Sequence, residues 1–170
     1  MKATLGKITF ACLCTVLLVI LPTCDTLDKN SLSPFLADTI PTIHQGVYGR
    51  IYFWEGDFMP MIYPDSARGR ITPVQRTVVV HTPTRFDSVD QADYSPFYRE
   101  ILTPRAGTTS SNSAGFFQIE LAPGRYSFFV VEESMYYANG GDGYGYLCPA
   151  TVVKDSLTYT VLNITYKASF

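Results

Sequence analysis

After its first two dozen residues, the chain alternates apolar and polar positions and does not repeat them at helical spacing. In the segment HQGVYGRIYFWEG, every second position is small or apolar: Val47, Gly49, Ile51 and Phe53. The positions between them hold longer side chains: Tyr48, Arg50, Tyr52 and Trp54. A period of two is typical of a strand, so this segment is predicted to be a strand with two distinct faces.

Further strands are predicted where short apolar or alternating runs lie between turns rich in proline and glycine. These runs cover residues 74–82, 97–103, 117–121, 126–130, 150–153 and 156–170. Residues 57–73 and 134–149 carry most of the remaining glycine and proline and are predicted to be long loops. The pattern predicts an all-β protein, a single Greek-key β-sandwich of about seven strands.

The last predicted strand alternates up to the end of the chain. Its apolar residues are expected on one face: Leu162, Ile164, Tyr166, Ala168 and Phe170. The run 74–82 is rich in valine, so we expect that strand at the centre of its sheet.

The most regular stretch, residues 110–134, is predicted to be a β-hairpin. Its first turn ends at Gly115, which can adopt a positive φ. Alternate residues of the next strand share an apolar face: Phe117, Ile119 and Leu121. Pro123 and Gly124 are predicted to form a tight turn, with Gly124 in the left-handed region, that returns the chain along the neighbouring strand.

The same stretch resembles the hallmark of carboxypeptidase regulatory-like domains, which is G-x-F-x-I-x-L-x-P-G-x-Y followed by an apolar strand. The matching residues are Gly115, Phe117, Ile119, Leu121, Pro123, Gly124 and Tyr126. The resemblance implies a transthyretin-like (prealbumin-type) sandwich over residues 44–170. It also implies a non-catalytic role, because such modules typically sit beside enzymes or receptors as spacers and interaction units.

The start of the chain has the layout of an export signal. Lys2 and Lys7 come before or at the start of an apolar run over residues 8–21, which is shorter than the ~20 residues needed to span a bilayer. An uncleaved anchor helix is the alternative, and Pro22 argues against it because proline interrupts a helix.

The residues that follow, Leu21-Pro-Thr-Cys24, resemble the lipobox of bacterial lipoproteins. The resemblance implies a signal peptide over residues 1–23, cleavage before Cys24 and acylation of that cysteine. Residues 24–43 would then form a flexible tether. Several acyl chains on one residue give stable anchoring, so we expect a lipoprotein exported to the bacterial envelope and held in the outer membrane.

Five tripeptides fit the pattern Asp-(Ser/Thr)-apolar, whereas about one is expected by chance. The pattern resembles the O-glycosylation acceptor that certain Gram-negative anaerobes use on exported proteins. The hydroxyl residues are Thr26, Thr39, Ser66, Ser88 and Ser156. The alternative is that Asp-Ser and Asp-Thr simply open turns.

Composition and charge narrow the partner classes. Apolar residues make up 46% of the chain and charged residues 16%, with a net charge of −2, so a folded protein is expected and nucleic acid is not an expected partner. With Cys12 and Cys14 in the leader and Cys24 acylated, Cys148 would be alone. It is predicted to be a small buried hydrophobic residue, with a reactive thiol as the alternative.

The sequence shows no arrangement that predicts catalysis, a cofactor or a metal site. His44 and His81 are the two histidines, neither begins a His-x-x-Glu pair, and both are predicted to be exposed at strand ends. Glu132 and Glu133 are adjacent on a predicted strand, so their carboxylates are expected to point to opposite faces. The protein is therefore not expected to be an enzyme.

Two aromatic loops, residues 52–63 and 135–146, are the candidate ligand surface. The residues proposed for it are Trp54, Phe58, Tyr63, Tyr136, Tyr137, Tyr144 and Tyr146. If both loops lie at one end of the sandwich, the rings form one binding surface. A structural or protein-interaction module is the first hypothesis and a carbohydrate-binding lipoprotein the second. The alternative to both is that the rings cover the ends of the core.

Overall fold

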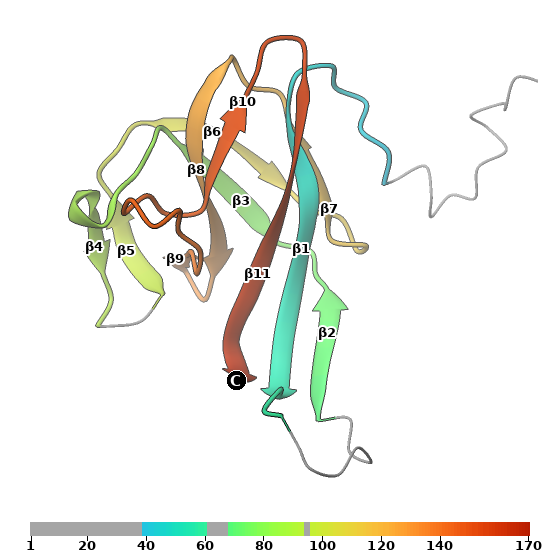
Figure 1. The fold of residues 1–170 in the computed structure, drawn as a ribbon, viewed down its shortest axis with the longest axis vertical. Coiled ribbons are helices and arrows are strands. Elements are labelled where there is room, and N and C mark those ends of the chain that lie inside the picture. Colours follow the sequence, from blue (N-terminus) through green and yellow to red (C-terminus); the bar gives the residue numbers. More distant parts are fainter. Residues whose placement is uncertain (1–38, 61–67, 94–95) are drawn as a thin grey trace, which may run out of the picture. The chain divides into compact units, whose positions relative to one another are not determined.

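The computed structural model describes residues 39–60, 68–93 and 96–170, and these residues form strands and turns with no α-helix. One sheet, called sheet A here, contains β1 (Gly46–Asp57), β2 (Gly69–Pro73), β7 (Phe116–Ile119) and β11 (Leu157–Ser169). Figure 1 shows these strands together. The chain is thus all-β, as predicted.

The second sheet, called sheet B, has seven strands. They are β3 (Thr77–His81), β4 (Val89–Gln91), β5 (Phe97–Ile101), β6 (Arg105–Ser110), β8 (Gly124–Glu132), β9 (Met135–Tyr137) and β10 (Pro149–Val152). A single turn of 3-10 helix covers Phe86–Ser88. The two sheets are consistent with a β-sandwich, and the Greek-key, prealbumin-type topology stays a prediction.

The number of strands is larger than the predicted seven because short strands lie in segments that were expected to be loops. β2 lies at the end of the predicted loop 57–73, and β9 lies in the predicted loop 134–149. Their residues pair with a neighbouring strand through the backbone, as Trp54 does with Ile71. Strands this short are held by backbone pairing and show no clear alternation of apolar and polar residues, so the sequence pattern does not reveal them.

The first and last strands are neighbours and run parallel, from the pair Gly46 and Leu157 to the pair Asp57 and Ser169. The sheet order is β11-β1-β2, with β7 also paired to β1. Close approach of the two long strands depends on Gly49, where a Cβ would lie 1.9 Å from the carbonyl oxygen of Thr160. β11 is therefore at the edge of sheet A (Figure 1).

The main core fills the space between the sheets. It contains Val47 and Ile51 from β1, and Val78 and Val80 from β3, all fully buried. This confirms the two-faced pattern of the first strand and the central place of β3, which lies between β8 and β6. A second cluster lies on the other side of sheet B, around Tyr98, Phe129 and Leu147.

The predicted hairpin is wrong, although the turn before it is confirmed. Gly115 has a φ of 73°, and its N–H donates to the carbonyl of Asn112 at 2.9 Å. The two strands that follow do not pair, because β7 belongs to sheet A and β8 to sheet B. Gly124 does not have a positive φ and instead begins β8.

The reason is that both strands face the same core from opposite sheets. The rings of Phe117 and Phe128 lie 6.4 Å apart across that core. Two consecutive strands that each have one apolar face can therefore form a hairpin within one sheet, or they can lie in different sheets and face each other across the core.

Within residues 39–60, 68–93 and 96–170, no helix is long and apolar enough to cross a membrane. The predicted signal peptide over residues 1–23 and the lipidation site Cys24 lie outside the described residues. The end of the predicted tether is described, and Thr42 is hydrogen-bonded to the side chain of Gln118 on β7 in both directions, at 2.8 Å each.

Candidate functional site

Three aromatic rings form a partly exposed cluster where β1 and β11 end. The rings of Trp54 and Phe58 lie 5.0 Å apart, and the ring of Phe170 stacks on Phe58 at 5.7 Å with 20° between the planes. Phe170 is 67% exposed, so the expectation that it faces the core is wrong. The register between β1 and β11 shifts after Phe53, which changes the alternation of the last residues of β11.

Backbone and side-chain contacts hold this cluster in place. The N–H of Phe58 donates to the carbonyl of Ser169 at 2.8 Å, and the indole N–H of Trp54 donates to Asn163 at 3.1 Å. The Phe58 ring lies against Gly69, where a Cβ would come within 2.4 Å of it. The absence of a side chain at Gly69 makes room for the ring.

Asp57 orders the turn that carries Phe58. Its carboxylate accepts a hydrogen bond from the N–H of Met59 at 2.8 Å and one from Arg68 at 2.7 Å. These two donors hold the pKa of Asp57 below its usual value. The turn is thus fixed by a charged side chain that is ionised at neutral pH.

Further aromatic side chains lie along the outer face of sheet A. The rings of Tyr48 and Tyr159 contact at 5.3 Å, and the residues between Tyr48 and the cluster alternate outward along β1. We define the outer face by ten residues: Tyr48, Arg50, Tyr52, Trp54, Phe58, Ile71, Tyr159, Val161, Asn163 and Phe170. Tyr159 is 52% exposed and Ile71 is 47% exposed, so apolar surface is open to solvent on β11 and on β2.

The second predicted loop contributes two tyrosines to the interior and not to a surface. Tyr137 is 2% exposed and is part of the main core. Tyr136 is half-buried and packs against Phe129 and His81. The prediction that these two residues belong to a ligand surface is therefore wrong, since both lie on a strand of sheet B.

The tip of this loop carries Tyr144, which is 78% exposed, and Tyr146, which lies between two arginines. The Arg125 guanidinium is 4.2 Å from the centre of the Tyr146 ring, and that of Arg85 is 5.3 Å from it. Asp142 pairs with Arg125 and accepts the N–H groups of both tyrosines. Although partial desolvation opposes it, these donors lower the pKa of Asp142.

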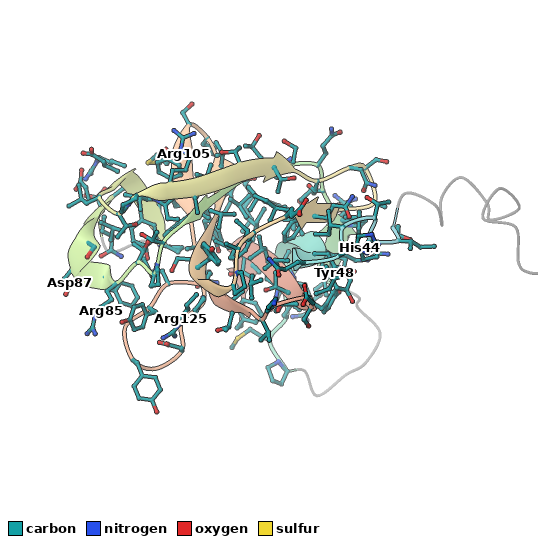
Figure 2. The ribbon with its side chains drawn as sticks, turned by 90° about the horizontal axis from the view of Figure 1, so that it is seen from above. His44, Tyr48, Arg85, Asp87, Arg105 and Arg125 are labelled. Carbon is teal, nitrogen blue, oxygen red and sulfur yellow. The ribbon has the colours of Figure 1, made fainter. Side chains whose placement is uncertain are left out.

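The two aromatic groups do not form one surface. In the part of the chain that the structure describes, no ring contact joins Trp54 or Phe58 to Tyr144 or Tyr146. Figure 2 shows Arg85 and Arg125, which flank Tyr146, well separated from Tyr48. Tyr63 lies outside the described residues.

His81 is buried, at 5% exposure, which overturns the prediction that it is exposed; His44 is exposed as predicted. The Nδ1–H of His81 donates to the carbonyl of Thr103 at 2.7 Å, and its Nε2 is buried with no partner among the described residues. Burial lowers the pKa of His81, Thr103 opposes this, and Arg105 adds to it. The ring of His81 packs against Phe129 and Tyr136, so it lies with the second cluster of buried residues.

The carboxylates of Glu132 and Glu133 converge, contrary to the prediction. The hydroxyl of Tyr166 lies 3.1 Å from an oxygen of Glu132 and 3.3 Å from one of Glu133. Alternation ends at Glu133 because this residue has a φ of 50° and lies in the turn after β8. Burial and the two carboxylates raise the pKa of Tyr166 to about 12. Arg76 pairs with Glu132, which is 4% exposed.

Cys148 is half-buried, and burial of the thiol raises its pKa, although the N–H groups of Gly140 and Asn139 oppose this. This agrees with the predicted structural cysteine. Among the described residues, no group of three His, Cys, Asp or Glu side chains is placed to hold a metal ion.

The predicted modification sites are only partly described. Ser88 and Ser156 are half-exposed, with Ser88 donating to Asp87 at 2.9 Å, and Thr39 is half-exposed at the start of the described chain. Thr26 and Ser66 lie outside the described residues. Glycosylation of any of them stays a prediction.

Of the ten outer-face residues, only Trp54 and Phe58 were among the site residues proposed from the sequence, and the missed residues include the aromatic residues Tyr48, Tyr159 and Phe170. The two faces of β1 were visible as alternation, but no sequence signal shows that β11 would lie parallel beside β1. Comparison with protein-family models, curated proteins and solved structures finds no match to this chain.

Proposed function

We propose that this protein is a non-catalytic, lipid-anchored module of the bacterial envelope that binds a partner protein through the outer face of sheet A. The observation that carries the proposal is the row of aromatic side chains along β1 and β11, from the Tyr48–Tyr159 pair to the cluster of Trp54, Phe58 and Phe170. Tyr159 and Phe170 are exposed and the other rings are half-buried. An exposed apolar patch of this kind on a folded protein marks an interaction site.

The composition of the outer face is that of a protein interface. Tyrosine, tryptophan, phenylalanine and arginine are enriched in such interfaces, and Trp, Tyr and Arg dominate their binding energy. From Tyr48 to Trp54 the face extends roughly 20 Å along β1, since a strand rises about 3.3 Å per residue. Tyr48, Tyr52, Trp54 and Tyr159 lie on paired strands, so little conformational entropy is lost when a partner binds.

The anchor and the non-catalytic role are supported by two resemblances. The lipobox-like segment before Cys24 supports attachment to the envelope, and the resemblance of residues 115–126 to the motif of carboxypeptidase regulatory-like domains supports a spacer or interaction role. In this proposal the tether of residues 24–43 lets the sandwich reach a partner away from the lipid surface.

The experiment is affinity capture from native membranes with the wild-type lipoprotein, Trp54→Ala and Phe170→Ala. We expect a partner that the wild-type protein retains and both variants lose. Tyr144→Ala is the matched control, because it removes an exposed ring far from the outer face. A partner retained equally by all four proteins, or lost only with Tyr144→Ala, would contradict the proposal.

A glycan is the second candidate ligand. The observation in its favour is the near-parallel pair of the half-buried Phe58 and the exposed Phe170, which offers flat apolar surface near the polar side chain of Asn163. Affinity gel electrophoresis with polysaccharides tests it. Retardation of the wild-type domain that is lost in Trp54→Ala and kept in Tyr144→Ala would favour the glycan, and no retardation of the wild-type protein would exclude the polysaccharides tried.

A further inference from the structure

The second edge of β11 has no strand beside it. β1 occupies one side of β11, and among the described residues no strand pairs with the other side. A sheet edge presents main-chain N–H and C=O groups that can pair with another chain.

Three contacts show which residues of β11 point to this free edge. The carbonyls of Ser156 and Thr160 point toward β1, since the first accepts the N–H of Gly46 and the second lies against Gly49. The N–H of Thr165 points the other way and donates to the hydroxyl of Tyr137 at 2.9 Å. Because the direction alternates along a strand, the main-chain groups of Tyr159, Val161 and Asn163 face the free edge.

The free edge is closed at both ends and open between them. At one end the hydroxyl of Thr158 donates to the carbonyl of Thr151 on β10 at 2.6 Å. At the other end Thr165 is held by Tyr137. The open part, residues 159–163, is about 17 Å long at 3.3 Å per residue, the length of an ordinary strand.

A pocket of about 90 Å³ lies beside this open part and reaches into the sandwich. β11 forms one wall, and the segment 138–140 with Cys148 forms the other. The floor consists of core residues: Phe128, Val130 and Tyr137. All ten residues that line the pocket are uncharged, so a charged side chain would lose part of its hydration there without gaining a partner of opposite charge.

Three other strands with an unpaired side have protection that the open part of β11 lacks. β2 carries Arg70 and ends in Pro73, β4 is three residues long, and β6 is tied to β7 by a hydrogen bond from Thr109 to the carbonyl of Gln118. Residues 157–163 of β11 contain no charge and no proline, which are the usual guards of an exposed edge.

We propose that an extended segment of a partner polypeptide pairs with residues 159–163 of β11 and places one small uncharged side chain, of the size of valine, in the adjoining pocket. Main-chain hydrogen bonds supply affinity in strand addition, and a pocket for an alternate side chain supplies specificity. The inference rests on the proposed interaction role and names its mode, because the added strand would extend the outer face beside Tyr159 and Val161.

The partner segment is assigned to a second polypeptide, because none of the described strands of this chain pairs with the free edge. Thr42 is hydrogen-bonded to Gln118 on β7, which pairs with β1 on the side away from β11. The chain therefore enters the sandwich at the opposite side of β1 from the free edge.

The test compares Val161→Pro with Val161→Thr in the full chain in detergent. Proline removes the N–H that faces the free edge and not one that bonds to β1, whereas threonine keeps the N–H and the β-branched shape. The probe is a fluorescein-labelled peptide with one valine flanked by threonine and glutamine, measured by fluorescence anisotropy. We expect the peptide to bind Val161→Thr as tightly as wild type and to bind Val161→Pro at least about tenfold more weakly.

A matched peptide with lysine in place of valine tests the pocket and is expected to bind about tenfold more weakly. A photo-crosslinking group in the valine peptide provides a readout on the wild-type chain that needs no variant, and crosslinks are expected at residues 138–140 and 161–163. No binding by the wild-type chain, equal binding to the proline and threonine variants, or crosslinks confined to other residues would overturn the proposal.

Trp54→Ala separates this inference from the proposed function. Trp54 lies on the outer face and not at the free edge, so this variant is expected to bind the valine peptide as wild type does. If Trp54→Ala still binds the peptide but no longer captures the native partner, the result supports strand addition at the free edge. Partner capture that survives in Val161→Pro overturns strand addition and leaves the outer face as the interaction site.

Discussion

At the scale of single residues, the interior of this sandwich contains polar groups that the alternating pattern did not reveal. His81 and Glu132 occupy strand positions that face the core, and both are almost fully buried. Glu132 is satisfied by Arg76 and Tyr166, whereas the Nε2 of His81 has no partner among the described residues. A buried group without a partner costs free energy that its neighbours must offset.

Acid is expected to destabilise the protein through His81. Because its folded pKa is lowered, the unfolded chain takes up a proton first as the pH falls below about 6.5, and the free energy of unfolding decreases toward the folded pKa. Urea denaturation at pH 7.5 and pH 5.5 should show a loss of up to about 1.4 kcal/mol per pH unit. His81→Gln should remove most of this dependence.

His44→Gln is the matched control, because His44 is exposed. It should leave the dependence on pH unchanged. A dependence that disappears in His44→Gln and persists in His81→Gln would show that the buried imidazole is not its source.

Tyr166→Phe is expected to lower the free energy of unfolding by about 1.5–3 kcal/mol, the usual worth of a hydrogen bond to a charged group. The change removes the hydroxyl that contacts Glu132 and Glu133 and so links β11 to the end of β8. Chemical denaturation measures the effect. Tyr159→Phe, which keeps an exposed ring, should change stability by less than about 0.5 kcal/mol.

The hydroxyl of Tyr166 is also expected to make folding stability decrease at alkaline pH. The raised pKa of Tyr166, about 12, means that the unfolded chain ionises first as the pH rises above about 10. Stability contributed by this group is complete below that pH and is lost as the pH approaches 12.

At the scale of elements, the sequence predicted which segments are strands better than it predicted which strands are neighbours. Periodicity reports the buried side of a strand, and Val47, Ile51 and Phe117 are buried as expected. Periodicity does not report which sheet a strand joins, so the crossing from β7 to β8 was mistaken for a hairpin. Backbone pairing decides that question, and it leaves little trace in composition.

Gly69 shows how an element supports the outer face. Gly69→Ala would place a methyl group within 2.4 Å of the Phe58 ring, which is the far end of a movable side chain. We expect Phe58 to leave its place beside Trp54, with a change in the emission of the single tryptophan and a cost in stability of about 1 kcal/mol or less.

Gly141→Ala is the control for this variant, since its Cβ would make an ordinary contact of 3.4 Å with the carbonyl of Tyr146. Tryptophan fluorescence and thermal unfolding measure both proteins. Unchanged emission from Gly69→Ala would mean that the glycine does not position Phe58.

At the scale of the whole molecule, only a small part of the candidate site could be predicted. Trp54 and Phe58 were identified from the aromatic content of one loop, and they do lie together at an exposed edge. Tyr48 and Tyr159 were not, because they meet through the parallel pairing of the first and last strands. Contacts between residues so far apart in sequence follow from topology and not from local pattern.

The central claim is that the outer face of sheet A is covered by a partner in the native envelope. Hydroxyl-radical footprinting of the lipoprotein in native membranes and after purification in detergent tests it without any substitution. Tyr48, Trp54, Tyr159 and Phe170 should be less reactive in membranes, while Tyr144 should react equally in both samples. Equal reactivity of the four outer-face rings in both samples would contradict the claim.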